Sequence, residues 1–89
     1  MAFAITFTTN LTKDQYDEIW RLLREEKADH PAGWLSHVGF EKDGAMRVVD
    51  VWDSMEHFEA FGSTLLPIIA MVGGEATPDI VEAHMFQAG

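Results

Sequence analysis

The first residues of the chain alternate between large apolar side chains and small or polar ones, a pattern that runs through residues 3–8. A period of two predicts a strand with one apolar face. Thr12 and Gln15 then have the spacing of a capping box, which marks the first turn of a helix. Apolar residues continue at helical spacing, with acidic residues on the other side, and we expect this helix to end at residues 30–33.

Two further strands are predicted at residues 34–41 and 45–52, on either side of the dipeptide Asp43-Gly44. Both segments are rich in apolar and β-branched residues, as strands of a partly buried sheet usually are. Asp-Gly between two such runs is typical of a hairpin with a two-residue turn. The sequence therefore predicts that these strands pair directly with each other.

The second half of the chain begins with a helix, for which Ser54 is a good N-cap. Pro67 is expected to break or restart this helix, because proline has no amide proton to donate to the preceding turn. Pro78 indicates a loop. Alternating apolar residues after it predict a last strand at residues 80–86.

The predicted order of elements is strand, helix, strand, strand, helix, strand. Such a chain is expected to form one α+β domain over residues 1–89, with a ferredoxin-like four-stranded antiparallel sheet and both helices on one face. In residues 45–52 both alternating sets of side chains are largely apolar, which indicates that both faces of the sheet are buried. A second subunit would cover the face without helices, so we expect a homodimer.

The hairpin turn determines which residue lies opposite Asp50, an aspartate in the otherwise largely apolar strand at residues 45–52. With a two-residue turn, His37 lies opposite Asp50 and Leu35 lies opposite Trp52. The first pair would occupy a non-hydrogen-bonded position, where an imidazole N–H reaches a carboxylate across the strands. A three-residue turn would shift the register by one residue and separate the two side chains.

A histidine paired with an aspartate is suited to proton transfer, because the carboxylate fixes one tautomer and leaves the other ring nitrogen free. His37 and Asp50 are therefore candidate catalytic residues. Trp52, on the same side as Asp50, is expected to provide a flat wall for a planar ligand. In the alternative interpretation, the pair only satisfies two buried polar groups and Trp52 belongs to the core.

Three more residues are candidates for substrate contacts. Tyr16 and Phe61 lie on the packed sides of the two helices, and His84 lies on the last predicted strand. A tyrosine at the position of Tyr16 is more often part of the core than a proton donor, and an exposed edge strand explains His84. His37, Asp50 and His84 could together bind a metal, but they lie on separate strands without a local ligand motif, so no metal site is expected.

Composition restricts the partners. The formal net charge of −9, with only six lysine and arginine residues, disfavours nucleic acid and anionic membrane surfaces. The chain has no cysteine, which excludes disulfides and thiolate chemistry and fits a reducing cytoplasm. Residues 1–10 lack the pattern of a signal peptide, and the longest apolar run, residues 65–72, is too short to span a membrane. With no nucleotide-binding motif either, we expect a cytoplasmic protein without a cofactor.

A resemblance to a known family can be stated on three segments: G-W-L-S-H at residues 33–37, D-G-A-M-R-V-V-D-V-W-D-S-M-E-H-F-E-A-F at residues 43–61, and a last strand with a histidine after a proline-containing turn. Together they resemble the small dimeric α+β-barrel proteins of the antibiotic biosynthesis monooxygenase-like superfamily. The most recognisable element is W-x-S-x-x-x-F, which begins at Trp52. It is more specific for the fold than for an activity.

The resemblance implies a homodimer whose sheets pack together, with a pocket in each protomer between its own helices and sheet. Members include cofactor-independent oxygenases of polycyclic aromatic substrates, haem-degrading enzymes and polyketide cyclases, and Trp52 matches a tryptophan that lines the pocket in the first two branches. Those branches also have an asparagine on the first strand, where this chain has Thr6 and Phe7. The haem branch has a histidine where this chain has Gly62, so haem degradation is not expected.

Three functions are compatible with these observations. In the first, the protein is a cofactor-independent monooxygenase-like or cyclase-type enzyme in which His37, oriented by Asp50, removes a proton from a planar aromatic or polyketide-like substrate. In the second, the same pocket binds a hydrophobic small molecule without turnover. In the third, the protein is a structural dimer, and the pair only holds the strands in register.

Overall fold

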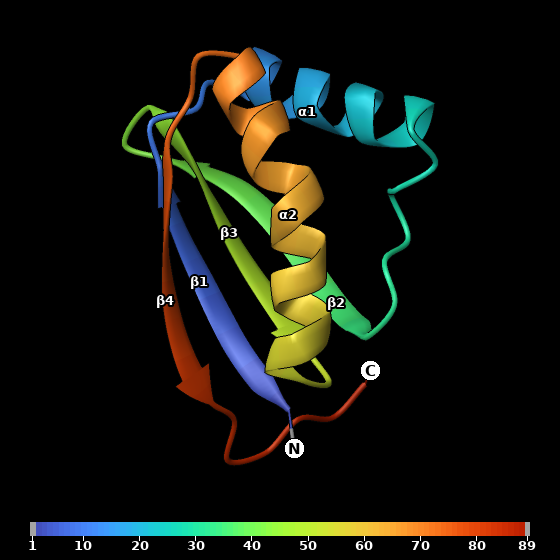
Figure 1. Cartoon of the computed structure of the whole chain (residues 1–89). Coiled ribbons are helices and arrows are strands. Elements are labelled where there is room, and N and C mark those ends of the chain that lie inside the picture. The colour runs from blue at the N-terminus through green and yellow to red at the C-terminus, as the bar shows by residue number, and fades with distance from the viewer. Residues whose placement is uncertain (1, 89) are drawn as a thin grey trace.

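The chain folds in the predicted order βαββαβ, and the computed structural model describes residues 2–88. Its strands form one antiparallel sheet in the order β2-β3-β1-β4, with α1 and α2 on the same side (Figure 1). This is the predicted ferredoxin-like α+β fold. The elements are β1 (Phe3–Thr9), α1 (Lys13–Glu25), β2 (Trp34–Lys42), β3 (Ala45–Trp52), α2 (Met55–Met71) and β4 (Ala76–Glu82).

The turn between β2 and β3 is the predicted two-residue hairpin. Lys42 pairs with Ala45, and Asp43 and Gly44 both have positive φ, 55° and 81°. This backbone is typical of a type I′ turn, whose twist matches that of the flanking strands. The register that follows from it places His37 opposite Asp50, as predicted.

The register changes near the start of β2, where the prediction that Leu35 pairs with Trp52 is wrong. A bulge between Trp34 and Ser36 places Trp34 opposite Trp52, and Leu35 is the extra residue. Because side chains alternate along a strand, one inserted residue changes which side chain reaches the helix-covered face. Trp34 takes the place predicted for Leu35, which is left 45% exposed.

Helix α1 begins at the predicted capping box. The amide of Gln15 donates to the Thr12 hydroxyl at 3.1 Å, and the amide of Thr12 donates to the Gln15 side chain at 2.9 Å. These two bonds satisfy backbone donors that the first turn of a helix leaves unpaired. The sequence pattern therefore located this helix start correctly.

The end of α1 was predicted too late, because the helix stops at Glu25 and not at residues 30–33. Lys27 adopts a left-handed conformation with φ 56°, and the amide of Ala28 returns to the carbonyl of Leu23 at 2.8 Å. This hydrogen bond is that of a Schellman motif, which usually has a glycine in the left-handed position. A lysine there gives no sequence signal, so the pattern alone pointed to the later Pro-Ala-Gly segment.

Pro67 does not interrupt α2, in contrast to the prediction. The helix continues to Met71, and the residues just after the proline, Ile68 and Ile69, are buried in the core. A proline removes one hydrogen bond from a helix interior, but burial of apolar side chains offsets that loss. The helix is therefore longer than its sequence suggested.

The last strand also differs from the prediction, since β4 spans Ala76–Glu82 and not residues 80–86. It includes Pro78, which pairs with Phe7 of β1. β4 is an edge strand, where a proline is tolerated because the ladder needs no donor on its free side. His84 consequently lies beyond the strand.

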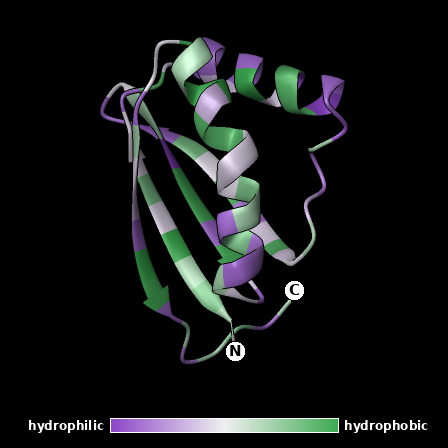
Figure 2. Cartoon of the chain, in the orientation of Figure 1, coloured by the Kyte–Doolittle hydropathy of each residue, from purple (hydrophilic) through white to green (hydrophobic). Residues whose placement is uncertain are grey.

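The hydrophobic core lies between the helices and one face of the sheet. Apolar bands alternate with polar ones along the strands, and α1 turns its polar side outward (Figure 2). Two clusters of buried residues form this core. The first contains Leu11, Ile19, Leu23, Met46, Ile68 and Ile69, and the second contains Ile5, Phe7, Val48 and Trp52.

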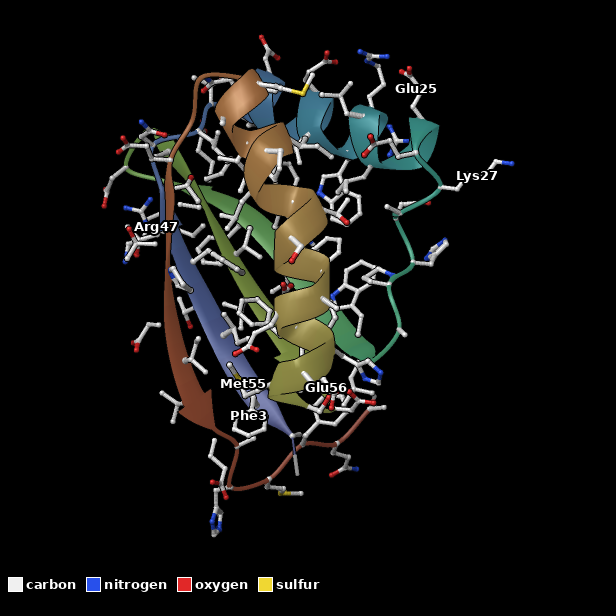
Figure 3. The ribbon with its side chains drawn as sticks, in the orientation of Figure 1. Phe3, Glu25, Lys27, Arg47, Met55 and Glu56 are labelled. Atoms are coloured by element: carbon white, nitrogen blue, oxygen red, sulfur yellow. The ribbon has the colours of Figure 1, made fainter. Side chains whose placement is uncertain are left out.

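The opposite face of the sheet carries apolar side chains that no helix covers. Val38, Phe40 and Val81 are 53%, 42% and 58% exposed. Arg47 extends on this side, away from α2 (Figure 3), and its guanidinium donates to the backbone carbonyl of Thr9 at 3.3 Å. The second face of the sheet is thus partly hydrophobic and open. Within residues 2–88, neither helix is long and apolar enough to cross a membrane.

Candidate functional site

The centre of the candidate site is a buried aspartate in the middle of β3. Asp50 is 4% exposed, and its Oδ1 lies 2.5 Å from Nδ1 of His37 on β2. A carboxylate can only accept, so Nδ1 carries the proton and donates it. An uncompensated carboxylate at this depth would cost several kcal/mol, and the imidazole provides the compensation. The predicted His37–Asp50 contact is therefore present.

Trp52 supports the aspartate from the same strand. Its indole nitrogen donates to Oδ2 of Asp50 at 3.4 Å, and its ring packs against Phe58 and Phe61 of α2. Trp52 is fully buried and does not line the cavity described below. In this structure α2 covers its ring, as in the alternative interpretation that assigns Trp52 to the core. Its observed contacts hold the carboxylate in place.

Tyr16 of α1 completes a chain of hydrogen bonds. Its hydroxyl lies 2.6 Å from Nε2 of His37. Because Nδ1 of the neutral imidazole carries the proton, Nε2 accepts and the tyrosine donates. Burial raises the pKa of Tyr16 above its ordinary value of 10.0, and the negative charge of Asp50 raises it further, against the lowering effect of Trp20. Tyr16 therefore keeps its proton at neutral pH.

Gly39 provides the space that the tyrosine needs. It lies on β2, two residues from His37 and on the same face of the sheet. A Cβ atom at position 39 would lie 2.8 Å from Cζ of Tyr16 and still closer to its hydroxyl oxygen. The sequence H-x-G therefore gives one strand both the imidazole and the gap into which the phenol fits.

The hydrogen-bonded chain opens into a cavity of about 50 Å³ between the helices and the sheet. The cavity wall is almost entirely apolar, apart from the groups already described. Its lining residues are Phe7, Thr9, Leu11, Tyr16, Ile19, Trp20, Leu23, Trp34, His37, Val48, Asp50, Phe61, Leu65, Ile69 and Ala76. Of the predicted site residues, Tyr16, His37, Asp50 and Phe61 therefore line one cavity.

Two tryptophans that the sequence analysis did not select complete this cavity. Trp20 of α1 and Trp34 of β2 stack on each other with ring centroids 5.6 Å apart. Both rings also present an edge-on contact to His37, at 5.2 Å and 5.3 Å. The helical spacing of Tyr16 and Trp20 was a signal for Trp20, because residues four apart share a helix face. The bulge that brings in Trp34 left no such signal.

His84, the remaining predicted site residue, is exposed and does not line the cavity. β4 ends at Glu82, so the strand alternation that placed His84 beside the sheet does not extend so far. Among residues 2–88, no three histidine and carboxylate side chains converge as metal ligands would. The structure thus does not bring His84 together with His37 and Asp50.

The chain contains a second histidine–aspartate contact, at the start of α2. Nδ1 of His57 lies 2.7 Å from Oδ1 of Asp53, and both side chains are 45% exposed. The hydrogen bond from His57 lowers the pKa of Asp53. We call His57 and Asp53 the exposed pair, and His37 and Asp50 the buried pair. The exposed pair lies in solvent and lines no part of the cavity.

The geometry of the buried pair suits it to accept a proton from a molecule in the cavity. Nε2 of His37 is placed to receive the hydroxyl proton of Tyr16. Asp50 would stabilise the charged imidazolium that this transfer forms. Tyr16 lines the cavity and can take up a proton from a ligand at the same time. A positioned base of this kind contributes about 10² to 10⁴ to a rate.

Similar proteins were found among solved structures. No family model matches the chain, and no curated protein matches its sequence. SnoaB, a cofactor-independent oxygenase from Streptomyces nogalater, is similar with a TM-score of 0.63 and 15% identity, over 96% of this chain and 93% of that one. A proposed antibiotic biosynthesis monooxygenase from Caulobacter crescentus CB15 has a TM-score of 0.68 and 14% identity, over 94% and 91%. Another from Chloroflexus aurantiacus J-10-fl has a TM-score of 0.57 and 22% identity, over 96% and 98%.

These similarities confirm the fold that the sequence resemblance implied. The chain has the α+β fold of antibiotic biosynthesis monooxygenase-like proteins along nearly its whole length. Fold alone does not determine function, which depends on the residues of a site. Any function of this chain therefore depends on the chemistry of the buried pair, Tyr16 and the cavity.

Proposed function

We propose that the protein is a cofactor-independent monooxygenase-like enzyme that removes a proton from a planar aromatic or polyketide-like substrate. The observation that carries this proposal is the chain of hydrogen bonds from Asp50 through His37 to Tyr16, which ends in an apolar cavity. A structure that only needed to satisfy a buried aspartate would not require a tyrosine at the second ring nitrogen. The fold shared with SnoaB, a cofactor-independent oxygenase, supports the same reaction class.

The proposed reaction begins with transfer of an acidic C–H proton to Tyr16, whose own proton moves to His37. The carbanion passes one electron to dioxygen, and recombination of the radical with superoxide gives a peroxide anion. This anion takes back the proton held by Tyr16 and His37 and becomes a hydroperoxide. Loss of water from this hydroperoxide leaves a ketone. One oxygen atom enters the substrate and the other leaves as water, so a CH₂ group becomes C=O without an external reductant. The chain's residues handle only the protons.

The cavity must enlarge to hold such a substrate, because a volume of about 50 Å³ is smaller than the ~150 Å³ that admits benzene. A groove of about 260 Å³ lies on the other side of α2. Phe7, Leu65, Ile69 and Ala76 line both spaces, so a shift of α2 would join them. The proposal therefore includes movement of α2 when substrate binds.

A homodimer is part of the proposal. Val38, Phe40 and Val81 leave an apolar surface on the sheet face without helices, and monomers rarely leave large apolar patches exposed. Packing of this face against a second copy would bury it. In analytical ultracentrifugation the wild type should sediment as a dimer, and the double substitution Val38→Lys with Phe40→Lys should give monomers. A wild type that stays monomeric would contradict this part.

Oxygen uptake tests the proposed activity. Anthrone is a suitable substrate, because it is planar, apolar and has an acidic CH₂ group beside aromatic rings. His37→Ala should reduce enzyme-dependent oxygen consumption by about 10² to 10⁴, as expected for loss of a general base. His57→Ala is the matched control, because it removes the histidine of the exposed pair, and it should consume oxygen as the wild type does.

The size of the cavity also favours a second candidate, in which the protein binds a smaller apolar molecule without turnover and the buried pair is structural. In that case, His37→Ala would change neither oxygen uptake nor ligand affinity. A cyclase-type reaction would start with the same proton removal but would consume no oxygen. Oxygen uptake that is equal in the wild type and His37→Ala would therefore exclude the monooxygenase proposal.

A further inference from the structure

One buried polar atom of the cavity wall has no partner. The indole nitrogen of Trp34 is shielded from solvent and makes no hydrogen bond within the described residues. More than nine in ten buried polar groups of folded proteins are hydrogen-bonded, so an orphaned donor requires an explanation. Trp34 lines the cavity, so the enlargement that a substrate requires would bring a ligand to this donor.

The backbone is arranged to bring this indole to the cavity. Regular alternation would have put Leu35 on the helix-covered face opposite Trp52, and a leucine leaves no polar group unpaired. The bulge between Trp34 and Ser36 replaces it with the tryptophan. Bulges are common beside functional sites, where they re-aim one side chain.

The other polar groups of the cavity wall are already engaged. Asp50 accepts from His37 and Trp52, and Tyr16 donates to His37. Thr9 donates its hydroxyl proton to the carbonyl of Met46 at 2.7 Å. Trp20 also lines the wall, and its side chain is hydrogen-bonded to Tyr16. Trp34 therefore carries the fully buried donor that has no partner in the described part of the wall.

We infer that Trp34 is a specificity-determining residue, whose indole N–H binds a carbonyl oxygen of a planar ligand in the cavity. This inference rests on the proposed function and narrows its substrate class to planar ketones and their enolates. The indole nitrogen lies on a ring that stacks against Trp20 and contacts the edge of His37. A ligand oxygen bound there would be held close to the group that removes the proton. As negative charge develops on that oxygen, the hydrogen bond strengthens.

Two ligands of nearly equal shape test the inference. Fluorenone and fluorene are both flat and tricyclic, but only fluorenone has a carbonyl oxygen. In isothermal titration calorimetry the wild type should bind fluorenone about tenfold more tightly than fluorene, as expected for one hydrogen bond. Trp34→Phe keeps an aromatic ring without the N–H, so it should bind the two ligands equally, with unchanged affinity for fluorene.

Trp20→Phe is the matched control, because it changes the stacked neighbour and leaves the orphaned donor in place. It should keep the preference for fluorenone. If Trp34→Phe fails to fold, the indole N–H signals of the wild type give a second measurement. The Trp34 proton should shift downfield with fluorenone and not with fluorene.

The outcomes separate this inference from the proposed function. The inference would be overturned if the wild type did not prefer fluorenone over fluorene, or if Trp34→Phe kept that preference. Loss of turnover in His37→Ala would still support the proposed function in either case. Failure of both ligands to bind the wild type would overturn the inference, and oxygen uptake with anthrone would still test the proposed function separately.

Discussion

The buried and exposed pairs share the same chemical groups and differ in their surroundings. Each joins Nδ1 of a histidine to Oδ1 of an aspartate, at 2.5 Å in the buried pair and 2.7 Å in the exposed pair. The side chains of the buried pair are 17% and 6% exposed, whereas those of the exposed pair are both 45% exposed. Only the buried pair contacts Tyr16 and Trp52 and borders the apolar cavity between the helices and the sheet.

This difference shows that the surroundings make a histidine–aspartate contact a candidate site. In solvent, water competes for both partners, and an exposed ion pair contributes little to stability. Beside an apolar cavity, each proton has a defined position, and the charge that forms during proton transfer is stabilised by fixed groups. The exposed pair is thus an internal reference for each effect expected of the buried pair.

Removal of the aspartate should give the largest contrast in stability. Asp50→Ala leaves His37 and the indole of Trp52 without their acceptor inside the core, and should lower the free energy of unfolding by about 3 kcal/mol. Asp53→Ala should be hard to distinguish from the wild type, because Asp53 lies in solvent. Urea denaturation followed by circular dichroism measures both. Equal losses in the two variants would show that burial does not matter here.

Loss of the tyrosine hydroxyl should be the next largest effect, and it appears in the rate. Tyr16→Phe keeps the ring in the cavity wall but breaks the link to His37, so kcat for anthrone should fall about 10²-fold while KM stays nearly constant. Steady-state oxygen uptake separates the two constants. If only KM rose, Tyr16 would contribute to substrate binding, and His37 would remove the substrate proton directly.

A methyl group at position 39 should disturb the same link more gently. Gly39→Ala places a carbon where the phenol of Tyr16 lies, so the hydroxyl must move and kcat should fall roughly tenfold. Gly62→Ala is the matched control, since its added carbon meets no atom within 4 Å. It should keep kcat and raise the free energy of unfolding by up to about 1 kcal/mol, because alanine has a higher helix propensity than glycine.

The smallest expected effect is a shift in the pKa of Tyr16. Tyr16 is the only tyrosine of the chain, so absorbance at alkaline pH reports on it alone. Its pKa should exceed 10.0 in the folded protein and return to that value in urea. Since the folded pKa is the higher one, this residue's contribution to stability is constant below about pH 10 and is lost as the pH rises through the folded pKa. A folded pKa at or below 10.0 would contradict the buried environment.

Local signals in the sequence predicted much of this arrangement. The Asp43-Gly44 turn fixed the register, and the register brought His37 and Asp50 together. The capping box at Thr12 located the start of α1. In each case the determining interaction lies within a few residues, where side-chain chemistry and backbone conformation are tightly coupled.

What the sequence did not show depends on contacts between distant residues. The bulge at Leu35 exchanges one side chain for another on the helix-covered face, and the stacking of Trp34 on Trp20 accompanies it. The link from Tyr16 to His37 requires the final position of α1 over β2. Trp52 was predicted as part of the site because its strand position was right, but the coverage of its ring by α2 could not be read from that strand.

The end of α1 could not be predicted from the sequence because of the conformation of one residue. Lys27 takes a left-handed conformation that a glycine usually adopts, so its sequence carried no stop signal. Figure 3 shows its side chain extending away from the body of the protein. At the corresponding end of α2 a glycine, Gly73, has the positive φ of 77°.

Hydrogen exchange at the substrate tests proton removal without the later oxygen chemistry. Anthrone would be incubated with the protein in D₂O without oxygen, and deuterium at its CH₂ group would be followed by NMR. Wild type and His57→Ala should accelerate exchange equally, and His37→Ala should lose about 10² to 10⁴ of that acceleration. Exchange at the same rate with His37→Ala as with the wild type would contradict the assignment of a proton-transfer role to the buried pair.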